Sequence, residues 1–426
     1  MAIPEARPRP PVVAPDEDAF TKFDGIVNTK SSKEIGRTAL TTAVNVEIDN
    51  EQRIMRRSGC SLFLAGNFRG AYANNSQNFL FAVIDSNLVR VNADASTTVL
   101  KSGLSLSGPP GGYCWSEDAS NYVSYTNGID SGVIRQGIDW VPIGIDTPIL
   151  NSAALVSSGA RQVMAFNIGG RYTSNQFRVF ATYLAADGRE SAPSAIIPIT
   201  APPESALIAI DVAPKYKYTN IYACPPGGAK YMLVGTYATQ TMTVTVNQLN
   251  AKGGPVYPYT VAVEAYPSEA RFIKHWNGRL YAAEYIQQVG VSVVWHSLPL
   301  QYHLFNKAED FFTVIGEVVL MLDTPKGLIV GTDNQIYHWD GTTLTELTQY
   351  GVVLGSCGDV TPDGTAYFWT VRGIAKAMPY ELLTEDTFSG DPGVFNHARL
   401  FYSHGHVKLL ASTMSGNPVF NQRIER

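Results

Sequence analysis

The residues in this sequence whose types and spacing could support chemistry are few. His404 and His406 stand two apart, so on a strand both imidazoles would face one side and could bind a metal ion with a third ligand. No third ligand stands at a supporting spacing, and a hairpin turn with two polar tips around Gly405 explains the same pattern. We therefore expect neither a metal site nor a cofactor.

Pairs of carboxylates are the strongest route to an enzyme, because glycosidases need two acids at a defined separation. The candidates are Glu309 with Asp310 and Glu385 with Asp386, which are adjacent in loops and have no arginine cluster beside them. The sequence also lacks the G-x-S-x-G, H-E-x-x-H and glycine-rich phosphate-binding patterns. We expect the protein not to be an enzyme.

Three aspartates, Asp333, Asp340 and Asp363, stand in the short polar segments T-D-N-Q, W-D-G and P-D-G. A calcium loop would place oxygen ligands at alternate positions, which these segments do not. Aspartate in such segments usually accepts hydrogen bonds from the backbone two residues on. We interpret the three as turn residues.

Arg53, Arg56 and Arg57 form the densest basic cluster. They could contact DNA phosphates in a channel or the acidic surface of a partner ring. The alternative is an ordinary charged turn, and the sequence leaves both open.

Composition favours a large β protein. The chain has 426 residues, 45% of them hydrophobic and 16% charged, with 37 Gly, 25 Pro and 22 Tyr. So few charges suggest that much of the surface is covered by neighbours. Four scattered cysteines lack metal-binding spacing, and we expect them to be reduced and mostly buried: Cys60, Cys114, Cys224 and Cys357.

Charge and hydropathy limit the partners and the location. The net charge of −5 gives no basic surface for gripping nucleic acid. The first residues lack the apolar region of a signal peptide, and the longest apolar stretch, 314–322, is too short to span a membrane and contains Glu317. We expect synthesis in the cytoplasm and no membrane insertion.

One hairpin pattern returns along the chain. The stretch GLIVGTDNQIYHWDG at 327–341 has two apolar, β-branched and aromatic runs separated by turn residues. Similar stretches start at Asn78, Asn121, Gly278, Gly327, Thr365 and Ala398. Most of these starts have the spacing of a four-stranded propeller blade of about 40–50 residues. The spacing predicts an all-β fold, an irregular β-propeller of about six blades; a pair of β-sandwiches is the alternative.

The long gap between the second and third hairpins predicts an inserted domain. Phe177, Val179, Ala181 and Tyr183 alternate as in a half-buried strand, and turns recur as in a small sandwich. We predict a Pro-rich arm at 1–20, the first part of the propeller at 21–154, a fibronectin-type-III-like β-sandwich at 155–265 and the rest of the propeller at 266–426. The arm is either disordered or laid on a partner.

Several motifs, in this order, resemble the tail nozzle and tail hub proteins of tailed bacteriophages. The first is A-x-N-V-x-I-D-N at 43–50, followed by the basic R-I-M-R-R-S-G at 53–59. The second is Y-x-x-x-D-G-x-E-S-x-P-S at 183–194, which is similar to the inserted fibronectin-like domain of that family. The third is the hairpin G-L-I-V-G-T-D-x-x-I-Y at 327–337.

The resemblance implies a structural virion protein, made in the host cytoplasm and located in the tail. It would form a homo-oligomeric ring, a hexamer by resemblance, below the portal and adaptor, and close and guide the DNA channel. Its partners would be the head-to-tail adaptor, other tail proteins and DNA in transit, with acidic loops facing the lumen. The alternatives are a tail-tip propeller that binds a receptor or glycan and, less favoured, a polysaccharide-degrading propeller.

Overall fold

The computed structural model describes residues 64–73, 78–105, 112–157, 160–163, 176–200, 207–213, 215–238, 241–250, 253–259, 262–353 and 358–384. It also describes Glu34 and short strands at 25–26, 39–40, 46–48, 54–56, 397–403, 406–412 and 418–423. Only the backbone is described for the strands of this second group and for residues 151–157, 160–163 and 241.

Two four-stranded antiparallel sheets follow one another in the first part of the chain. The first contains β5 (Phe68–Ala73), β6 (Phe79–Ile84), β7 (Asn87–Asn92) and β8 (Thr97–Lys101). The second contains β9 (Cys114–Glu117), β10 (Val123–Thr126), β11 (Ser131–Arg135) and β12 (Asp139–Val141). Phe81, Leu88, Tyr125 and Ile134 are buried in the core between them. Each sheet therefore buries one face against its neighbour.

More antiparallel sheets follow the insertion. The next contains β22 (Phe272–Trp276), β23 (Arg279–Ile286), β24 (Val291–Leu298) and β26 (Phe311–Ile315), and it is extended by β25 (Gln301–Phe305) and β21 (Glu264–Ala265). After it come β27 (Val318–Thr324), β28 (Gly327–Thr332), β29 (Ile336–Trp339) and β30 (Leu344–Thr348). The hairpin predicted at 327 is formed by β28 and β29.

The last sheets are shorter. One contains β31 (Asp359–Val360), β32 (Ala366–Thr370), β33 (Gly373–Ala377) and β34 (Glu381–Leu382). The other contains β35 (His397–Ser403), β36 (His406–Ser412) and β37 (Pro418–Arg423). Near the N-terminus, β1 (Gly25–Ile26) pairs in parallel with β2 (Ala39–Leu40), and β3 (Val46–Ile48) pairs with β4 (Ile54–Arg56). Strand β3 lies beside β37, so segments from opposite ends of the sequence meet.

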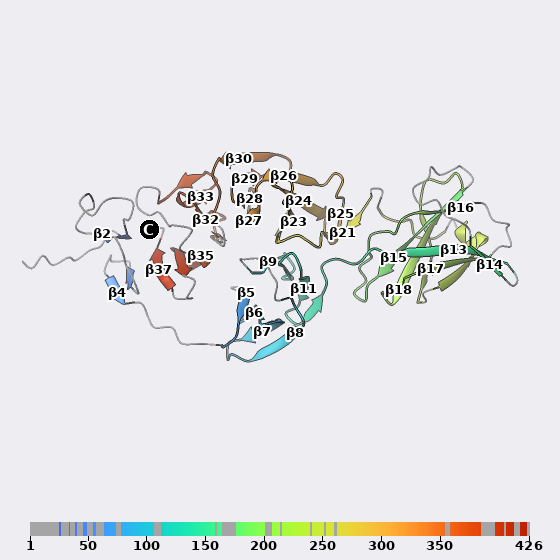
Figure 1. Ribbon diagram of the computed structural model, residues 1–426, viewed down its shortest axis with the longest axis horizontal. Coiled ribbons are helices and arrows are strands. Elements are labelled where there is room, and N and C mark those ends of the chain that lie inside the picture. The colour runs from blue at the N-terminus through green and yellow to red at the C-terminus, as the bar shows by residue number, and fades with distance from the viewer. Residues whose placement is uncertain are drawn as a thin grey trace, which may run out of the picture.

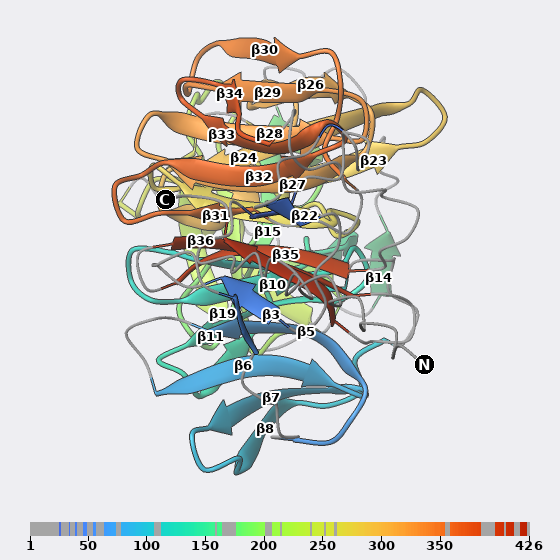
Figure 2. The ribbon, with the colours of Figure 1, turned by 90° about the vertical axis from the view of Figure 1, so that its left-hand side faces the viewer.

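The sheets are set around a common centre (Figure 1). Strands β5, β9 and β27 lie toward the middle, and β8 and β30 lie at the rim. First strands of successive sheets adjoin one another, β9 beside β22, β22 beside β27 and β27 beside β31. Seen from the side, the sheets stack on one another, and the strand axes of different sheets run in nearly the same direction (Figure 2). The all-β prediction is confirmed, and the arrangement is propeller-like.

A β-sandwich projects from this propeller-like body between β12 and β21 (Figure 1). One sheet contains β14 (Ala160–Val163), β13 (Leu150–Ser157), β17 (Leu207–Val212) and β20 (Thr241–Thr245). The other contains β16 (Ile197–Thr200), β15 (Gln176–Leu184), β18 (Tyr218–Cys224) and β19 (Met232–Tyr237). Helix α1 (Val246–Leu249) follows β20 and is too short to span a membrane; no other helix occurs among the described residues.

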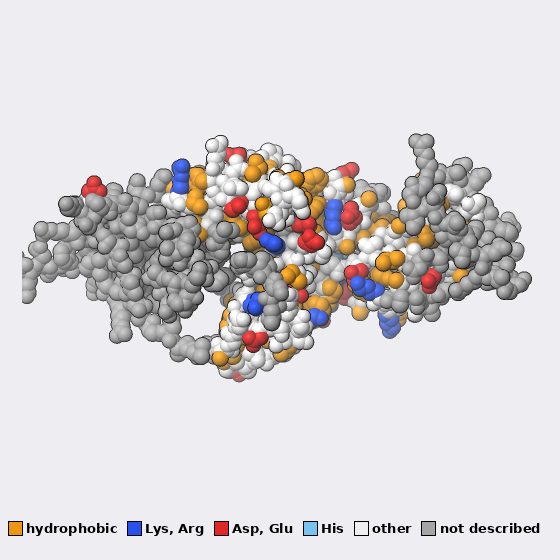
Figure 3. Space-filling view, viewed as in Figure 1, with side chains coloured by type: hydrophobic (Ala, Val, Ile, Leu, Met, Phe, Trp, Pro, Cys, Tyr) orange, Lys and Arg blue, Asp and Glu red, His pale blue; other side chains and the backbone are white. Residues whose placement is uncertain are grey.

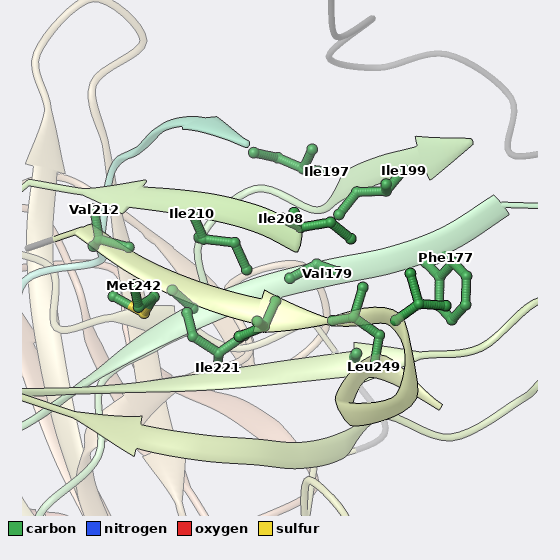
Figure 4. Packing of buried hydrophobic residues seen from close by; sticks show 14 of the residues in the cluster. Phe177, Val179, Ile197, Ile199, Ile208, Ile210, Val212, Ile221, Met242 and Leu249 are labelled. Atoms are coloured by element: carbon green, nitrogen blue, oxygen red, sulfur yellow. The ribbon is translucent and has the colours of Figure 1, made fainter. Parts of the chain in front are cut away.

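The alternation predicted for 177–183 builds the sandwich core (Figure 4). Phe177, Val179, Ala181 and Tyr183 point inward from β15, because successive side chains of a strand face opposite sides. They meet side chains of β17, β18 and β20. The helix after β20 is fixed by a capping box between Thr245 and Gln248.

Two glycines with the same φ allow a test of how closely β5 packs against Gly112, which precedes β9. Gly112 and Gly103 both have φ +75°. A Cβ on Gly112 would lie 2.1 Å from the Arg69 carbonyl oxygen, whereas a Cβ on Gly103 would have no described heavy atom within 4 Å. We expect Gly103→Ala to lower the free energy of unfolding by about 1 kcal/mol and Gly112→Ala by clearly more, roughly 2–3 kcal/mol. Urea denaturation measures both; equal losses would contradict the close approach of β5 to Gly112.

Candidate functional site

The motif at 183–194 forms the joint between the sandwich and the propeller-like body. It connects β15 to β16 through a tight turn, in which Gly188 has φ +84° and its N–H donates to the Ala185 carbonyl. The hydroxyls of Ser191 and Ser194 accept hydrogen bonds from the backbone N–H groups of Tyr183 and Ala181. The serines therefore hold the motif against β15, while Asp187 and Arg189 face the body.

Asp187 is the centre of the joint. One of its carboxylate oxygens lies 3.0 Å from Arg135 Nη1 and 2.7 Å from Arg189 Nε. Arg135 ends β11 of the body, whereas Asp187 and Arg189 belong to the sandwich. The Asp187 side chain is 7% exposed, and its pKa is lowered by its hydrogen bond to Arg189 and by both arginine charges, which outweigh the opposing effect of burial. Because a buried charge without partners is destabilising, the ionised Asp187 carboxylate depends on pairing with both arginines.

Arg189 and Glu190 extend the joint in two directions. The Arg189 guanidinium donates to the carbonyl of Ile143, at 2.8 Å, and to that of Pro142, at 2.9 Å, on the segment that leads into the sandwich. His303 of β25 contacts the Glu190 carbonyl oxygen through Nε2 at 2.9 Å. Because a carbonyl only accepts, Nε2 carries the hydrogen.

The Glu190 side chain lies against the outer face of β15 and β18. Its carboxylate accepts hydrogen bonds from Thr182 Oγ1, from Asn220 Nδ2 at 2.9 Å and from Tyr222 OH at 3.3 Å. Tyr222 packs on Phe180, with ring centroids 5.1 Å apart, in an aromatic cluster. Glu190 thus joins the outer face of the β15–β18 sheet to the body, through its side chain on one side and its carbonyl on the other.

Burial of His303 gives the joint a pH dependence. Burial, and then the charge of Arg189, lower the pKa of His303 from 6.5 to about 4. Between these pH values the unfolded chain binds more protons than the folded one, so stability falls as the pH drops from 6.5 toward 4. Over this window we expect unfolding free energy to fall by up to about 3 kcal/mol more in the wild type than in His303→Gln, whose side-chain N–H can replace Nε2–H. Urea titrations at several pH values measure it; parallel curves would contradict it.

A second polar cluster lies on the inner strands of the body. Tyr72 OH donates to Glu117 Oε2 at 2.6 Å, and Lys274 Nζ lies 2.7 Å from Asp323 Oδ1. Glu117, Lys274, Asp323 and Asp359 lie on β9, β22, β27 and β31, which adjoin one another in that order. Burial, then the hydrogen bond to Glu117 and the charges of Glu117, Asp323 and Asp359 raise the pKa of Tyr72. Figure 3 shows acidic and basic side chains beside the hollow between the upper and lower sheets. We name Tyr72, Glu117, Lys274, Asp323 and Asp359 the axial cluster; carboxylates predominate in it.

The structure places several of the predicted residues. Asp340 accepts from the N–H groups of Thr342 and Thr343, and Asp363 from that of Thr365, as turn residues do. Asp333 instead accepts from Glu317 N–H across two loops. Among the described residues no group of three or more His, Cys, Asp or Glu could hold a metal ion.

The adjacent acids Glu309 and Asp310 serve different partners. Glu309 accepts from Asn306 Nδ2 at 3.2 Å, and Asp310 lies 3.8 Å from Arg279. Of the cysteines, Cys114 and Cys224 form no disulfide; Cys224 is buried, and the half-buried Cys114 thiol donates to the Ile273 carbonyl at 3.4 Å. Glu385, Asp386, His404, Cys60 and Cys357 lie outside the described residues. His406 begins β36, where only the backbone is described.

The three arginines of the predicted contact cluster are only partly placed. Arg56 ends β4 and pairs with Val46 of β3. Arg53 and Arg57 lie outside the described residues. Sequence reasoning also missed Arg135 and His303, the body residues of the joint. No local signal marks them, because their partners are distant in sequence.

Fold and joint together define an all-β protein with a propeller-like body and a fixed sandwich. No protein family and no curated protein matches the chain. Among solved structures it is similar to the Pan2 WD40 domain of Neurospora crassa, with 9% identity, a TM-score of 0.35, and coverage of 85% of this chain and 90% of that one. It is also similar to the extracellular domain of a putative hybrid two-component system from B. thetaiotaomicron, with 11% identity, a TM-score of 0.33 and 84% coverage; the match spans 40% of that chain. Similarity this low carries no argument about function.

Proposed function

We propose that this chain is a structural virion protein that forms a ring in a phage tail, as a nozzle or hub below the portal and adaptor. The observation that carries the proposal is the joint. The motif at 183–194, on which the resemblance partly rests, fixes the sandwich to the body through Asp187, Arg189 and the Glu190 carbonyl. A ring subunit must present all its contact surfaces in one geometry, and such a joint provides it.

We further propose a finer architecture. The six blades would be the sheets that begin with β5, β9, β22, β27, β31 and β35, with β3 completing the last beside β37. The sandwich would be a fibronectin-type-III-like insertion at 155–265, between propeller parts at 21–154 and 266–426, after an arm at 1–20. The strand connectivity supports this assignment. One sheet has the order β16-β15-β18-β19, so β15 pairs with both β16 and β18, while β17, which lies between β16 and β18 in the chain, belongs to the other sheet.

The proposed role is structural and not catalytic. The carboxylates described above form ion pairs or hydrogen bonds with neighbouring groups of the chain, as Asp187 pairs with two arginines. In the assembled tail, acidic loops would face the lumen, and weak repulsion of the DNA backbone would let DNA pass, since each phosphate contact would retard it. Arg53, Arg56 and Arg57 would contact an adjoining ring or the DNA.

The purified full-length chain tests the proposal. Mass photometry and negative-stain electron microscopy should show closed rings, hexamers by resemblance, which bind a purified adaptor ring. A lone subunit that binds host glycans on an array would instead support a receptor-binding propeller. Turnover of a polysaccharide, abolished by replacing one carboxylate, would support an enzyme.

A further inference from the structure

Strand β26 is the outer edge of its sheet. It pairs with β24, and among the described residues no other strand pairs with it. Figure 1 shows β23, β24 and β26 in this order from the middle of the body toward its rim. Phe312 and Val314 are buried against β27–β30, whereas Phe311, Thr313 and Ile315 are exposed. The strand therefore presents an alternating row of side chains and one unpaired edge to solvent.

Hydrogen bonds at both ends of β26 show which backbone groups face β24. The Asp310 carbonyl, just before the strand, accepts from His296 N–H at 3.0 Å. Gly316 N–H, just after it, donates to the Gly290 carbonyl at 2.9 Å. Backbone direction alternates along a strand, so the even-numbered residues of this segment direct their N–H and C=O groups toward β24.

The odd-numbered residues of β26 direct their backbone groups to the other side, which is the edge of the sheet. Ile315 N–H accordingly donates to Tyr337 OH at 3.2 Å and not to β24. The N–H and C=O groups of Phe311 and Thr313, and the Ile315 carbonyl, lie on the same edge. A row of such donors and acceptors is a template for pairing with another strand.

The β26 edge has no charged residue, unlike the outer strands of the four-stranded sheets of the body. Proteins usually protect an exposed edge with a charge, a proline or a bulge. The sequence of β26 is Phe-Phe-Thr-Val-Ile, and it pairs with β24 in unbroken register. The other outer strands, β8, β12, β30 and β34, contain Lys101, Asp139, Glu346 and Glu381. Strand β26 is therefore an edge without this protection.

The charges that flank β26 have partners in their own chain. Asp310 precedes the strand and lies 3.8 Å from Arg279. Glu317, two residues after the strand, pairs with Arg271 at 2.5 Å. A positively charged partner strand would gain little at this edge, whereas an uncharged strand fits it.

A second copy of β26 is such a strand. Two copies related by a two-fold axis at Thr313 run antiparallel, with Thr313 opposite Thr313 and Phe311 opposite Ile315. Thr–Thr pairs and aromatic–β-branched pairs are favourable across antiparallel strands, and no like charges meet between the strands. The edge groups then form roughly four backbone hydrogen bonds, while Ile315 N–H keeps its bond to Tyr337.

We propose that two copies of this chain join edge to edge through antiparallel β26 strands, which make one continuous sheet across the contact. The contact is isologous, because both copies use the same strand. A ring of cyclic symmetry is closed by heterologous contacts, so this pairing is a separate contact and goes beyond the proposed function.

Substitutions at Thr313 in the full-length protein test the pairing, because this residue meets its own copy at the axis. Thr313→Lys and Thr313→Glu should each weaken the dimer about tenfold or more in analytical ultracentrifugation, since like charges then face each other. An equal mixture of the two variants should form mixed dimers. Thr345→Lys is the matched control on β30, where the exposed Thr345 precedes Glu346, and it should dimerise like the wild type.

A cysteine at the same position tests the register. Paired Cα atoms about 5.5 Å apart suit a disulfide, so mild oxidation should cross-link Thr313→Cys into dimers, and Thr345→Cys should cross-link no more than the wild type. If Thr313→Lys does not fold by circular dichroism, Thr313→Pro should weaken the dimer in its place. Proline there removes an N–H from the edge and no hydrogen bond to β24.

The outcomes separate this contact from the proposed function. A Thr313→Cys variant that gives no cross-link, or a dimer that persists unchanged in folded Thr313→Lys or Thr313→Pro, overturns the pairing. So does a wild-type chain that stays a single subunit at high micromolar concentration. Rings that persist in Thr313→Lys leave the ring proposal standing, whereas a wild type that forms β26 dimers but no rings overturns the ring alone.

Discussion

Replacing Asp187 with alanine should release the sandwich from the body. The change leaves Arg135 and Arg189 without the carboxylate that they share at 3.0 and 2.7 Å. A hydrogen-bonded charge that loses its buried partner costs about 2–3 kcal/mol. We expect a loss of this size in urea denaturation and faster protease cleavage in the segments that lead into and out of the sandwich.

Asp139 provides the matched control. It contacts the same Arg135, with 2.5 Å between Nη2 and Oδ2, but its side chain is 55% exposed. Exposed ion pairs contribute little, so Asp139→Ala should lower the free energy of unfolding by about 0.5 kcal/mol and leave cleavage unchanged. Equal effects of the two variants would mean that the joint does not depend on the buried carboxylate.

Replacing Trp369 with alanine should give the largest loss of stability. Trp369 is 1% exposed and follows Phe368 in β32. Phe368 belongs to the core shared with β27–β30, and Trp369 is buried on the other side of the strand. Removing a buried tryptophan leaves a cavity and costs about 3–5 kcal/mol. Chemical denaturation monitored by circular dichroism should show this loss as a lower urea midpoint.

Val371, two residues later, is the control for this prediction. It is 42% exposed in the turn after β32, so Val371→Ala should change the free energy of unfolding by less than about 0.5 kcal/mol. A tryptophan variant as stable as the valine variant would show that the Trp369 side chain is not held in a packed interior.

Much of the fold could be predicted from local patterns. The hairpin at 327–341 combines β-branched runs with turn residues, and it forms β28 and β29. Alternation at 177–183 identified the inner face of β15. These features depend on residues close in sequence, which single-sequence patterns register. Strand β13 begins at Leu150, five residues before the boundary of 155 that the sequence suggested, and the exact boundary stays a prediction.

The joint could not be predicted in the same way. The motif at 183–194 was visible, but its partners Arg135 and His303 stand in unremarkable strands far away in the chain. Only the three-dimensional arrangement supplies that information.

The adjacency of β3 and β37 has a consequence for biosynthesis. A ribosome makes β3 long before β37, so β3 must wait for its neighbour while the residues between 48 and 418 are translated. During that interval the nascent polypeptide holds an unpaired edge, which a chaperone or a sibling polypeptide on the same messenger could capture. Premature termination before residue 418 would leave the same edge permanently open.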